Sequence, residues 1–344
     1  MVSRPVRPFT HRNTASKTVR AAVLGAAAVL VLASCAGEPE SEKKAADPGD
    51  AYPVEVTSCG HTSTIEARPT KAITLNQGAT EVVLALGLSD RLAGTAYLDD
   101  EIPEKWRAAY DAVPVLSDEY PTNEELVAAD PDFLYASYGS AFTPEVAGTQ
   151  TDLDEKGTAS YLSPFGCEDK TQRPEPSFEA VWDEIDAVAK ALGDPAAAEQ
   201  FRDTQQAQLD ELATTAAGEG LTVFWYDGGD KTPTVGAGGG GPQLVLDAVK
   251  ATNIFADLDG GWNEGNWESV IAADPDVIVF ADAAWSTAEE KIAYLRGDPV
   301  LSQLTAVQDE AFVTIPFSES TPGVRLVDGA VGVSEQLEKL AANR

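Results

Sequence analysis

Apolar residues recur along the chain with two spacings, one typical of strands and the other typical of helices. Residues 53–66 alternate between apolar and polar, which predicts a β-hairpin with its turn at Gly60. The short apolar run 72–75 predicts a buried strand, and residues 79–88 then repeat their apolar positions with helical spacing. The run 92–96 predicts the next strand. Strands that alternate with helices at this distance indicate a parallel α/β lobe.

One helix–turn–strand block occurs twice. Residues 123–137 read NEELVAADPDFLYAS, and residues 267–281 read WESVIAADPDVIVFA. Each copy has a Glu seven residues before the Pro of its Asp-Pro-Asp turn, Glu124 in the first and Glu268 in the second. Each copy predicts a short amphipathic helix, a stop at the Pro and a buried strand. Such a block can recur in any α/β protein, but the matched glutamates favour two similar lobes.

Two helices are predicted between the copies, over 177–192 and 195–217. Ser177 can cap the first helix, and Pro195 suits the first turn of the second. The second helix has no internal Gly or Pro and would span about 30 Å. We expect it to be a rigid strut between the lobes, the alternative being an ordinary surface helix. The predicted boundaries are 53–176 for the first α/β lobe, 177–218 for the helical connection and 219–344 for the second α/β lobe.

The N-terminal segment has the pattern of an export signal. Basic residues up to Arg20 precede the apolar run 21–32, which is too short to span a bilayer as a mature helix. The run ends in Leu-Ala-Ser-Cys, which is similar to the lipobox at which bacterial lipoproteins are cleaved and lipid-modified. We therefore predict a lipoprotein signal peptide over 1–34, lipidation at Cys35 and a flexible tether over 35–52. A plain secretory signal is the alternative.

The composition is strongly acidic, with 24 Lys and Arg against 56 Asp and Glu. Five of the basic residues precede position 35 and none of the acids does, so the rest of the chain carries 19 basic residues against all 56 acids. A surface with this charge repels nucleic acid and anionic lipid. We therefore expect no nucleic-acid partner.

Cys59 and Cys167 are the two cysteines that remain after the signal, and they allow one intramolecular pairing. In an exported domain a disulfide is the default, and closing a loop of roughly 100 residues contributes on the order of 4–5 kcal/mol in the chain-entropy model. The alternative, a redox or metal site, lacks a CxxC motif and a nearby His cluster. The chain has two histidines, His11 in the predicted signal and His61 beside the hairpin turn. They cannot form a His-rich metal site, and neither is well placed for a Ser-His-Asp triad. We expect no catalytic residues and no metal site.

The glycine run 236–241 formally satisfies the dinucleotide fingerprint G-x-G-x-x-G with Gly236, Gly238 and Gly241. It leaves an exported dinucleotide-binding oxidoreductase as an alternative function. The excess of glycine makes this match nearly automatic, and the first βα unit of the mature chain lacks the motif. A glycine-rich loop that lines a cleft between two lobes explains the same residues.

Aromatic residues gather at the ends of predicted strands and in the loops that follow them. In α/β lobes ligands bind at the carboxyl ends of strands, so these side chains indicate an aromatic-lined cleft for a bulky ligand. Packing in the core is the alternative for each of them. The predicted ligand contacts are Gln77, Tyr97, Tyr138, Trp225, Tyr226, Trp262, Trp285 and Arg325.

Taken together, these features resemble periplasmic-binding-protein family 2, the substrate-binding lipoproteins of ABC importers for ferric siderophores, haem and cobalamin. The resemblance covers residues 54–342. It rests on the lipobox, the hairpin, the long helix, R-P-x-K-A-I-x-L at 68–75, T-E-V-V-L-A-L-G-L-x-D-R-L-A-G-T at 80–95 and the two E-x-x-x-x-x-D-P-D blocks. The Cys59/Cys167 pair is not general to the family and resembles its actinobacterial iron-siderophore branch.

The resemblance implies two three-layer α/β lobes with mainly parallel sheets, joined by a single long rigid helix in the class III arrangement, with the ligand between them. It implies that Glu124 and Glu268 dock to arginine pockets on a permease, and Arg325 fits the closing R-L-x-x-G segment. The expected protein is a non-enzymatic monomer, lipid-anchored through Cys35 at the extracytoplasmic face of the cell membrane. It would capture an iron(III)–siderophore complex and deliver it to the ABC permease and its ATPase. Haem and cobalamin are the alternative ligands.

Overall fold

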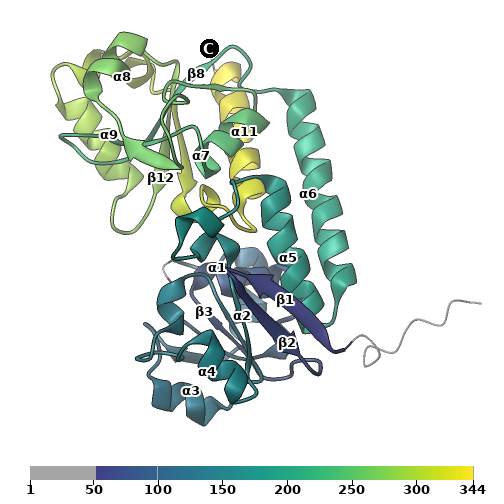
Figure 1. Cartoon of the computed structure of the whole chain (residues 1–344). Coiled ribbons are helices and arrows are strands. Elements are labelled where there is room, and N and C mark those ends of the chain that lie inside the picture. The colour runs from purple at the N-terminus through teal and green to yellow at the C-terminus, as the bar shows by residue number, and fades with distance from the viewer. Residues whose placement is uncertain (1–51, 99, 344) are drawn as a thin grey trace, which may run out of the picture. The chain divides into compact units, whose positions relative to one another are not determined.

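The computed structural model describes residues 52–98 and 100–343 (Figure 1). The predicted signal peptide, Cys35 and the tether up to residue 51 lie outside the described residues. No helix within the described ranges is long and apolar enough to cross a membrane. In the same part of the chain, no group of three or more His, Cys, Asp or Glu side chains is placed to hold a metal ion.

The first lobe begins with the predicted hairpin, β1 (Val54–Ser58) and β2 (His61–Ile65), which turns at Cys59 and Gly60. A five-stranded parallel sheet follows, with strand order β5-β4-β3-β6-β7. Its strands are β3 (Ala72–Leu75), β4 (Leu92–Ala96), β5 (Val115–Ser117), β6 (Phe133–Ala136) and β7 (Ala159–Leu162). Its helices are α1 (Gln77–Ala85), α2 (Glu104–Tyr110), α3 (Asn123–Ala129) and α4 (Gln150–Glu155), with the 3-10 turns η2 (Ser89–Arg91), η3 (Gly139–Phe142), η4 (Pro164–Gly166) and η5 (Lys170–Gln172).

Alternation along β6 explains why this sheet is covered on both faces. Phe133 and Tyr135 point to a core that includes side chains of α1 and of the helix α5 (Phe178–Leu192). Leu134 and Ala136 point the other way, into a core with side chains of α3 and α4. A fully apolar strand therefore serves two cores, because successive side chains of a strand leave opposite faces. The first lobe has the expected three layers.

The second lobe has a mixed sheet, with the path β11-β9-β8-β12-β13 and β10 paired with β8. Strands β10, β8, β12 and β13 are parallel, whereas β9 and β11 run antiparallel at one edge. The strands are β8 (Thr222–Gly228), β9 (Thr234–Gly236), β10 (Thr252–Asn253), β11 (Trp262–Glu264), β12 (Val277–Asp282) and β13 (Phe312–Pro316). The helices are α7 (Gly241–Ala248), α8 (Trp267–Ala273), α9 (Ala288–Gly297), α10 (Thr305–Gln308) and α11 (Leu326–Ala342), with η6 (Leu301–Gln303) and η7 (Phe317–Glu319).

The chain passes from the first lobe to the second through α5 and α6 (Pro195–Thr215), which lie side by side (Figure 1). Ser177 caps α5 and Asp194 caps α6, and Pro195 opens α6 as expected. Ala198 near the start of α6 packs in the core of the first lobe, while Leu212 near its end packs in the core of the second. One continuous helix is thus fixed to both cores, and the predicted two-lobed α/β fold with a linking helix is confirmed.

The repeated block has the same backbone geometry in both lobes. Asp130 ends α3 and Asp274 ends α8, each in the left-handed conformation, with φ of 48° and 40°. The second Asp of each turn then holds the start of a neighbouring strand. Asp132 accepts hydrogen bonds from the Thr70 and Lys71 backbone N–H groups, and Asp276 accepts one from the Thr222 N–H. The shared Asp-Pro-Asp sequence is therefore a structural fastening between helix and sheet.

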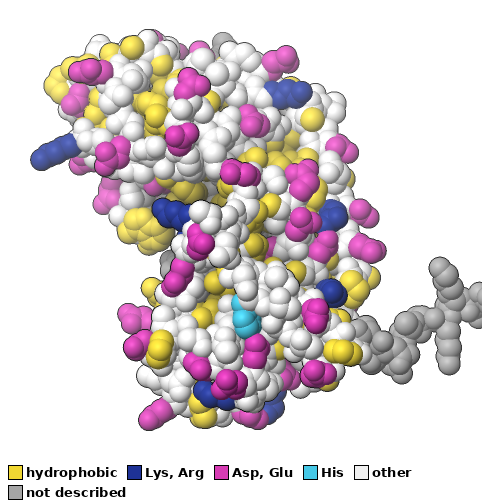
Figure 2. All heavy atoms as spheres, viewed as in Figure 1, with side chains coloured by type: hydrophobic (Ala, Val, Ile, Leu, Met, Phe, Trp, Pro, Cys, Tyr) yellow, Lys and Arg dark blue, Asp and Glu magenta, His cyan; other side chains and the backbone are white. Residues whose placement is uncertain are grey.

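The acidic composition is visible on the surface. Figure 2 shows Asp and Glu side chains spread over the face in view, with fewer Lys and Arg side chains among them. Half of the described Lys and Arg side chains form ion pairs with Asp or Glu, among them Lys71 with Asp130 at 2.8 Å and Arg296 with Glu310 at 2.6 Å.

Candidate ligand-binding site

A cavity of about 1030 Å³ is lined by residues of both lobes. It lies where parallel strands end: Gln77 follows β3, Tyr97 follows β4, Tyr138 follows β6, Trp285 follows β12 and Phe317 follows β13. The loops that follow parallel strands all lie at the same edge of the sheet, so side chains from several loops meet there. The cavity thus has the position and size of a small-molecule site.

Aromatic rings line the cavity from both sides. From the second lobe, Phe317 packs edge-on against Trp285 at 5.4 Å between ring centroids and lies 5.7 Å from Trp262. From the first lobe, Tyr97 and Tyr120 lie 4.6 Å apart. Trp285 is 64% exposed and lines the cavity, so much of its ring surface is open to a ligand. Such rings offer large contact areas at a low entropic cost and suit a bulky ligand.

Tyr97 is held in an uncommon backbone conformation. Its φ is 60°, in the left-handed region that a bulky residue rarely adopts. Its N–H donates to the Ser117 carbonyl at 3.3 Å. Backbone of this kind costs of the order of 1–3 kcal/mol and is found preferentially at binding sites. The fold thus places this ring beside the cavity at the expense of local strain.

The floor of the cavity is a buried polar network that joins the lobes. Gln77 donates to Glu81 at 2.8 Å, and Glu81 lies 3.5 Å from the guanidinium of Arg325 in the second lobe. Arg325 also donates to Glu319 at 2.8 Å and to the Ser318 hydroxyl at 2.6 Å. Burial raises the pKa of Glu81 and of Glu319, and the Arg325 charge opposes the rise in both. One arginine thus holds a carboxyl from each lobe, Glu81 from the first and Glu319 from the second.

A second buried carboxyl, Glu184 of α5, reaches the cavity from the linking helices. It is 5% exposed and accepts a hydrogen bond from the Tyr135 hydroxyl at 2.6 Å. Burial raises the pKa of Glu184, which the hydrogen bonds from Tyr135 and Ser163 counteract. Burial and the neighbouring Glu184 carboxyl raise the pKa of Tyr135 well above its ordinary value. The phenol therefore keeps its proton and acts as the donor.

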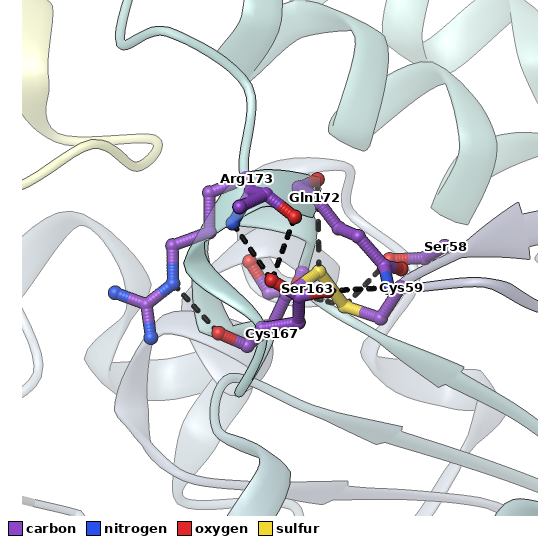
Figure 3. The surroundings of a disulfide bond; sticks show 8 residues. Ser58, Cys59, Ser163, Cys167, Gln172 and Arg173 are labelled. Carbon is purple, nitrogen blue, oxygen red and sulfur yellow. Dashed lines mark hydrogen bonds between the residues drawn. A yellow bond between two sulfur atoms is a disulfide. The ribbon is translucent and has the colours of Figure 1, made fainter.

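The rim of the cavity includes the loop 163–176, which a disulfide fastens to the hairpin (Figure 3). Cys59 and Cys167 are bonded, with their Cα atoms 5.2 Å apart, so the expected pairing is confirmed. Lys170 and Arg173 of this loop line the cavity. The Arg173 Nε–H donates to the Cys167 carbonyl at 2.6 Å (Figure 3).

Six of the predicted ligand contacts line this one cavity: Gln77, Tyr97, Tyr138, Trp262, Trp285 and Arg325. Trp225 and Tyr226 do not, which corrects the sequence-based expectation. Both are 0% exposed, because β8 continues to Gly228 and places them inside the strand instead of at its end. Tyr226 packs with Phe224 and Trp267 in the core. These two side chains hold the sheet together and are omitted from the ligand contacts proposed below.

Several lining residues escaped the sequence analysis: Glu81, Tyr120, Phe165, Lys170, Arg173 and Glu184. Glu81 sits in the matched segment 80–95, but nothing in the sequence shows that its side chain turns toward the second lobe. The pairing of Cys59 with Cys167 was the available signal for Lys170 and Arg173, since it ties their loop to one end of the first lobe.

The glycine run serves packing and not phosphate binding. The N–H groups of Ala237, Gly238 and Gly239 donate to carbonyls of residues 258–261, so they are not free to cradle a phosphate. A Cβ on Gly238 would collide with the Ala256 carbonyl, so the chain must be glycine at this close approach. Gly239 and Gly240 line the cavity, as expected of a cleft loop. The dinucleotide-binding alternative is wrong.

Glu124 and Glu268 occupy the same position in their helices, the second residue of α3 and of α8. Both are exposed, and within the described chain neither carboxylate makes a hydrogen bond or ion pair. Capping is done by their neighbours: Thr122 and Glu125 form a capping box on α3, and Asn266 caps α8. The two glutamates are thus spare carboxylates at equivalent places on the two lobes.

The family described as periplasmic binding protein matches residues 73–319. An uncharacterized ABC transporter substrate-binding lipoprotein of Bacillus subtilis is 25% identical over 320 residues, 90% of this chain and 94% of that protein. A vitamin B12-binding protein of Vibrio cholerae is 23% identical over 248 residues, 70% of this chain and 83% of that protein.

Solved structures give the same picture of the fold. A periplasmic binding protein from Veillonella parvula has a TM-score of 0.70 and 28% identity, covering 82% of this chain and 96% of that one. An ABC-type Fe3+-hydroxamate transport system from Saccharomonospora viridis has a TM-score of 0.65 and 20% identity, covering 83% and 99%. A periplasmic heme-binding protein from Roseiflexus has a TM-score of 0.61 and 20% identity, covering 79% and 99%.

Proposed function

Because this chain belongs to the periplasmic binding protein family, whose members bind substrates and are not enzymes, we propose that it is the substrate-binding lipoprotein of an ABC importer and that it captures an iron(III)–siderophore complex. The cavity between the lobes is the proposed binding site. The ligand would be delivered to the permease and its ATPase at the extracytoplasmic face of the cell membrane. The protein would act as a monomer anchored through Cys35, with the signal removed ahead of it.

The observation that carries the ligand assignment is the pair of aromatic walls around a cavity of about 1030 Å³. A siderophore complex is bulky and presents apolar edges around a shielded iron, so flat rings can hold it without contacting the metal. The likeness in fold to the Fe3+-hydroxamate transport protein supports this class. The proposed contacts are Gln77, Tyr97, Tyr138, Trp262, Trp285 and Arg325, with Tyr120 and Phe317 added from the structure.

Docking to the permease is assigned to Glu124 and Glu268. A carboxylate without a partner keeps its capacity for charge-assisted hydrogen bonds, which arginines on a permease can supply. The matching positions on two lobes favour a partner that contacts both lobes at once.

The test is a titration of the mature domain with an iron(III) trihydroxamate, haem and cobalamin, followed by tryptophan fluorescence. We expect the trihydroxamate to quench emission and bind most tightly. Trp285→Ala should weaken this binding by about 1–3 kcal/mol, the cost of losing a central aromatic anchor. Val300→Ala, an exposed apolar residue of the second lobe outside the cavity, is the matched control and should bind unchanged.

Tighter binding of haem or cobalamin than of the trihydroxamate would transfer the assignment to that ligand. Equal affinity in Trp285→Ala and in the unmodified protein would show that the rings are not ligand contacts.

A further inference from the structure

The loop 163–176, here called the strapped loop, is fastened at three places. Its start continues from β7, its end leads into the cap of α5, and Cys167 in its middle is bonded to Cys59 of the hairpin turn. Gly166 lies directly on the backbone of Ser137, where any Cβ would collide with the Ser137 carbonyl. The disulfide joins residues 108 positions apart, so it is the long-range tie that fixes where this loop lies.

Two cations of the strapped loop face the cavity without acidic partners. Lys170 and Arg173 both line it, and among the described residues neither forms an ion pair. Arg325, the other cation of the cavity, is shared between Glu81 and Glu319.

The disulfide also sets the position of the Arg173 guanidinium. Its Nε–H donates to the carbonyl of Cys167, the disulfide residue itself, as Figure 3 shows. The two terminal nitrogens make no hydrogen bond within the described chain, so their N–H groups remain available. An arginine held at Nε presents those nitrogens in a fixed plane that matches a carboxylate.

We propose that the Cys59–Cys167 disulfide positions Lys170 and Arg173 as an anion-binding pair at the rim of the cavity. The ligand would therefore carry an exposed carboxylate, and its affinity would depend on the oxidised state of this disulfide. This inference deepens the proposed function and rests on the same cavity. Glu175 also lines the cavity from the strapped loop, which leaves one net positive charge among the loop's lining side chains.

Whether Lys170 and Arg173 attract anions to the cavity can be measured without a siderophore. Iodide is an anionic quencher of tryptophan and acrylamide a neutral one, and Trp285 is 64% exposed in the cavity. At a constant ionic strength below about 0.1 M the Debye length exceeds about 10 Å, so the two charges act across the cavity. Lys170→Gln with Arg173→Gln should then lower the iodide quenching constant by about two- to threefold. Acrylamide quenching should not change. Glu175→Gln is the control of opposite sign on the same loop and should raise iodide quenching.

The disulfide is then removed in two ways, as Cys59→Ser with Cys167→Ser and by mild reduction of the folded protein. Circular dichroism establishes that the fold remains. We expect either treatment to lower iodide quenching to the level of the double Gln variant, and the double Gln change to have no further effect when combined with the serines. Trp285→Phe combined with Trp262→Phe isolates the cavity signal, because these two tryptophans line the cavity and the difference should vanish without them.

Binding of an uncharged iron(III) trihydroxamate and of an analogue that carries added carboxylates completes the test. The double Gln variant should lose about tenfold in affinity for the carboxylated complex only, the loss expected for a charge-assisted contact. Iodide quenching that ignores either the cations or the disulfide would overturn the proposal. If iodide behaves as expected and neither iron complex binds the unmodified protein, the anion site stands and the iron–siderophore assignment fails.

Discussion

Glu184, one of several buried carboxyls with a raised pKa, makes stability depend on pH. Burial raises its pKa in the folded protein above the ordinary value of 4.5. The folded state therefore holds this proton more tightly than the unfolded state. The resulting stabilisation is complete below pH of about 4.5 and is lost as the pH rises through the folded-state pKa.

Glu184→Gln keeps an oxygen acceptor for the Tyr135 hydroxyl but does not titrate. Urea unfolding from pH 4 to pH 8 should therefore show the variant gaining stability over the unmodified protein as the pH rises, up to a plateau. Tyr135→Phe removes a hydrogen bond that lowers the pKa of Glu184, so it should shift the loss to higher pH. A difference between Gln and Glu that is constant with pH would contradict this account.

At the residue scale, the sequence predicted aromatic contacts wherever a ring follows a strand in a loop, as with Trp285 and Tyr138. The prediction was wrong for Trp225 and Tyr226. Their strand does not end with the apolar run, because Asp227 and Gly228 still belong to β8. Lys170 and Arg173 were not found, because which side chains of a polar loop face a cavity depends on tertiary packing.

At the element scale, the two Asp-Pro-Asp turns explain why a sequence block recurs. The first Asp adopts the left-handed conformation that ends the helix, and the second anchors the start of the neighbouring parallel strand, β3 in the first lobe and β8 in the second. Thr222 also donates its hydroxyl to Asp276 at 2.7 Å, and Thr70 does the same to Asp132 at 3.0 Å. Helix, turn and strand are thus coupled through one carboxylate in each lobe.

Replacing this carboxylate should destabilise either lobe. Asp132→Ala or Asp276→Ala leaves backbone N–H and hydroxyl donors without their acceptor, which costs about 1–3 kcal/mol in the free energy of unfolding. Urea titration measures the loss. Asp257→Ala, an exposed aspartate of the second lobe, serves as the control and should stay within about 0.5 kcal/mol. Equal stability of all three variants would show that the hydrogen bonds of Asp132 and Asp276 do not stabilise the fold.

Element order was largely readable from the sequence, since the hairpin, the buried strands and the long helix all follow from periodicity and caps. The antiparallel edge of the second sheet was not. Strands β9 and β11 are three residues each, too short for a period to register, and they form because the glycine run lies against residues 258–261.

At the scale of the whole molecule, substitutions at Glu124 and Glu268 test docking to the permease without disturbing the fold. Glu124→Arg with Glu268→Arg should abolish uptake in vesicles that contain the permease, because like charges would then meet at the proposed arginine pockets. Ligand affinity should be unchanged, since both residues lie outside the cavity. Transport at the unmodified rate would exclude these glutamates from docking.

Glu125→Ala is the matched control, one position along the same helix. Glu125 accepts from the Thr122 N–H at 2.8 Å and completes the capping box. Its loss should lower the free energy of unfolding slightly, while uptake per folded molecule stays the same.

The core of the first lobe is completed by a residue from near the far end of the chain. Val324 is 3% exposed and packs in the same cluster as Val181 and Trp182, and its carbonyl accepts from Gln205 at 2.9 Å. A ribosome, or an export channel that threads the chain from its N-terminus, supplies the residues in order. The first lobe is therefore complete in sequence before Val324 arrives to fill its place in the core. The packing of the first lobe is thus finished only when nearly all of the second lobe has been made or has passed through the channel.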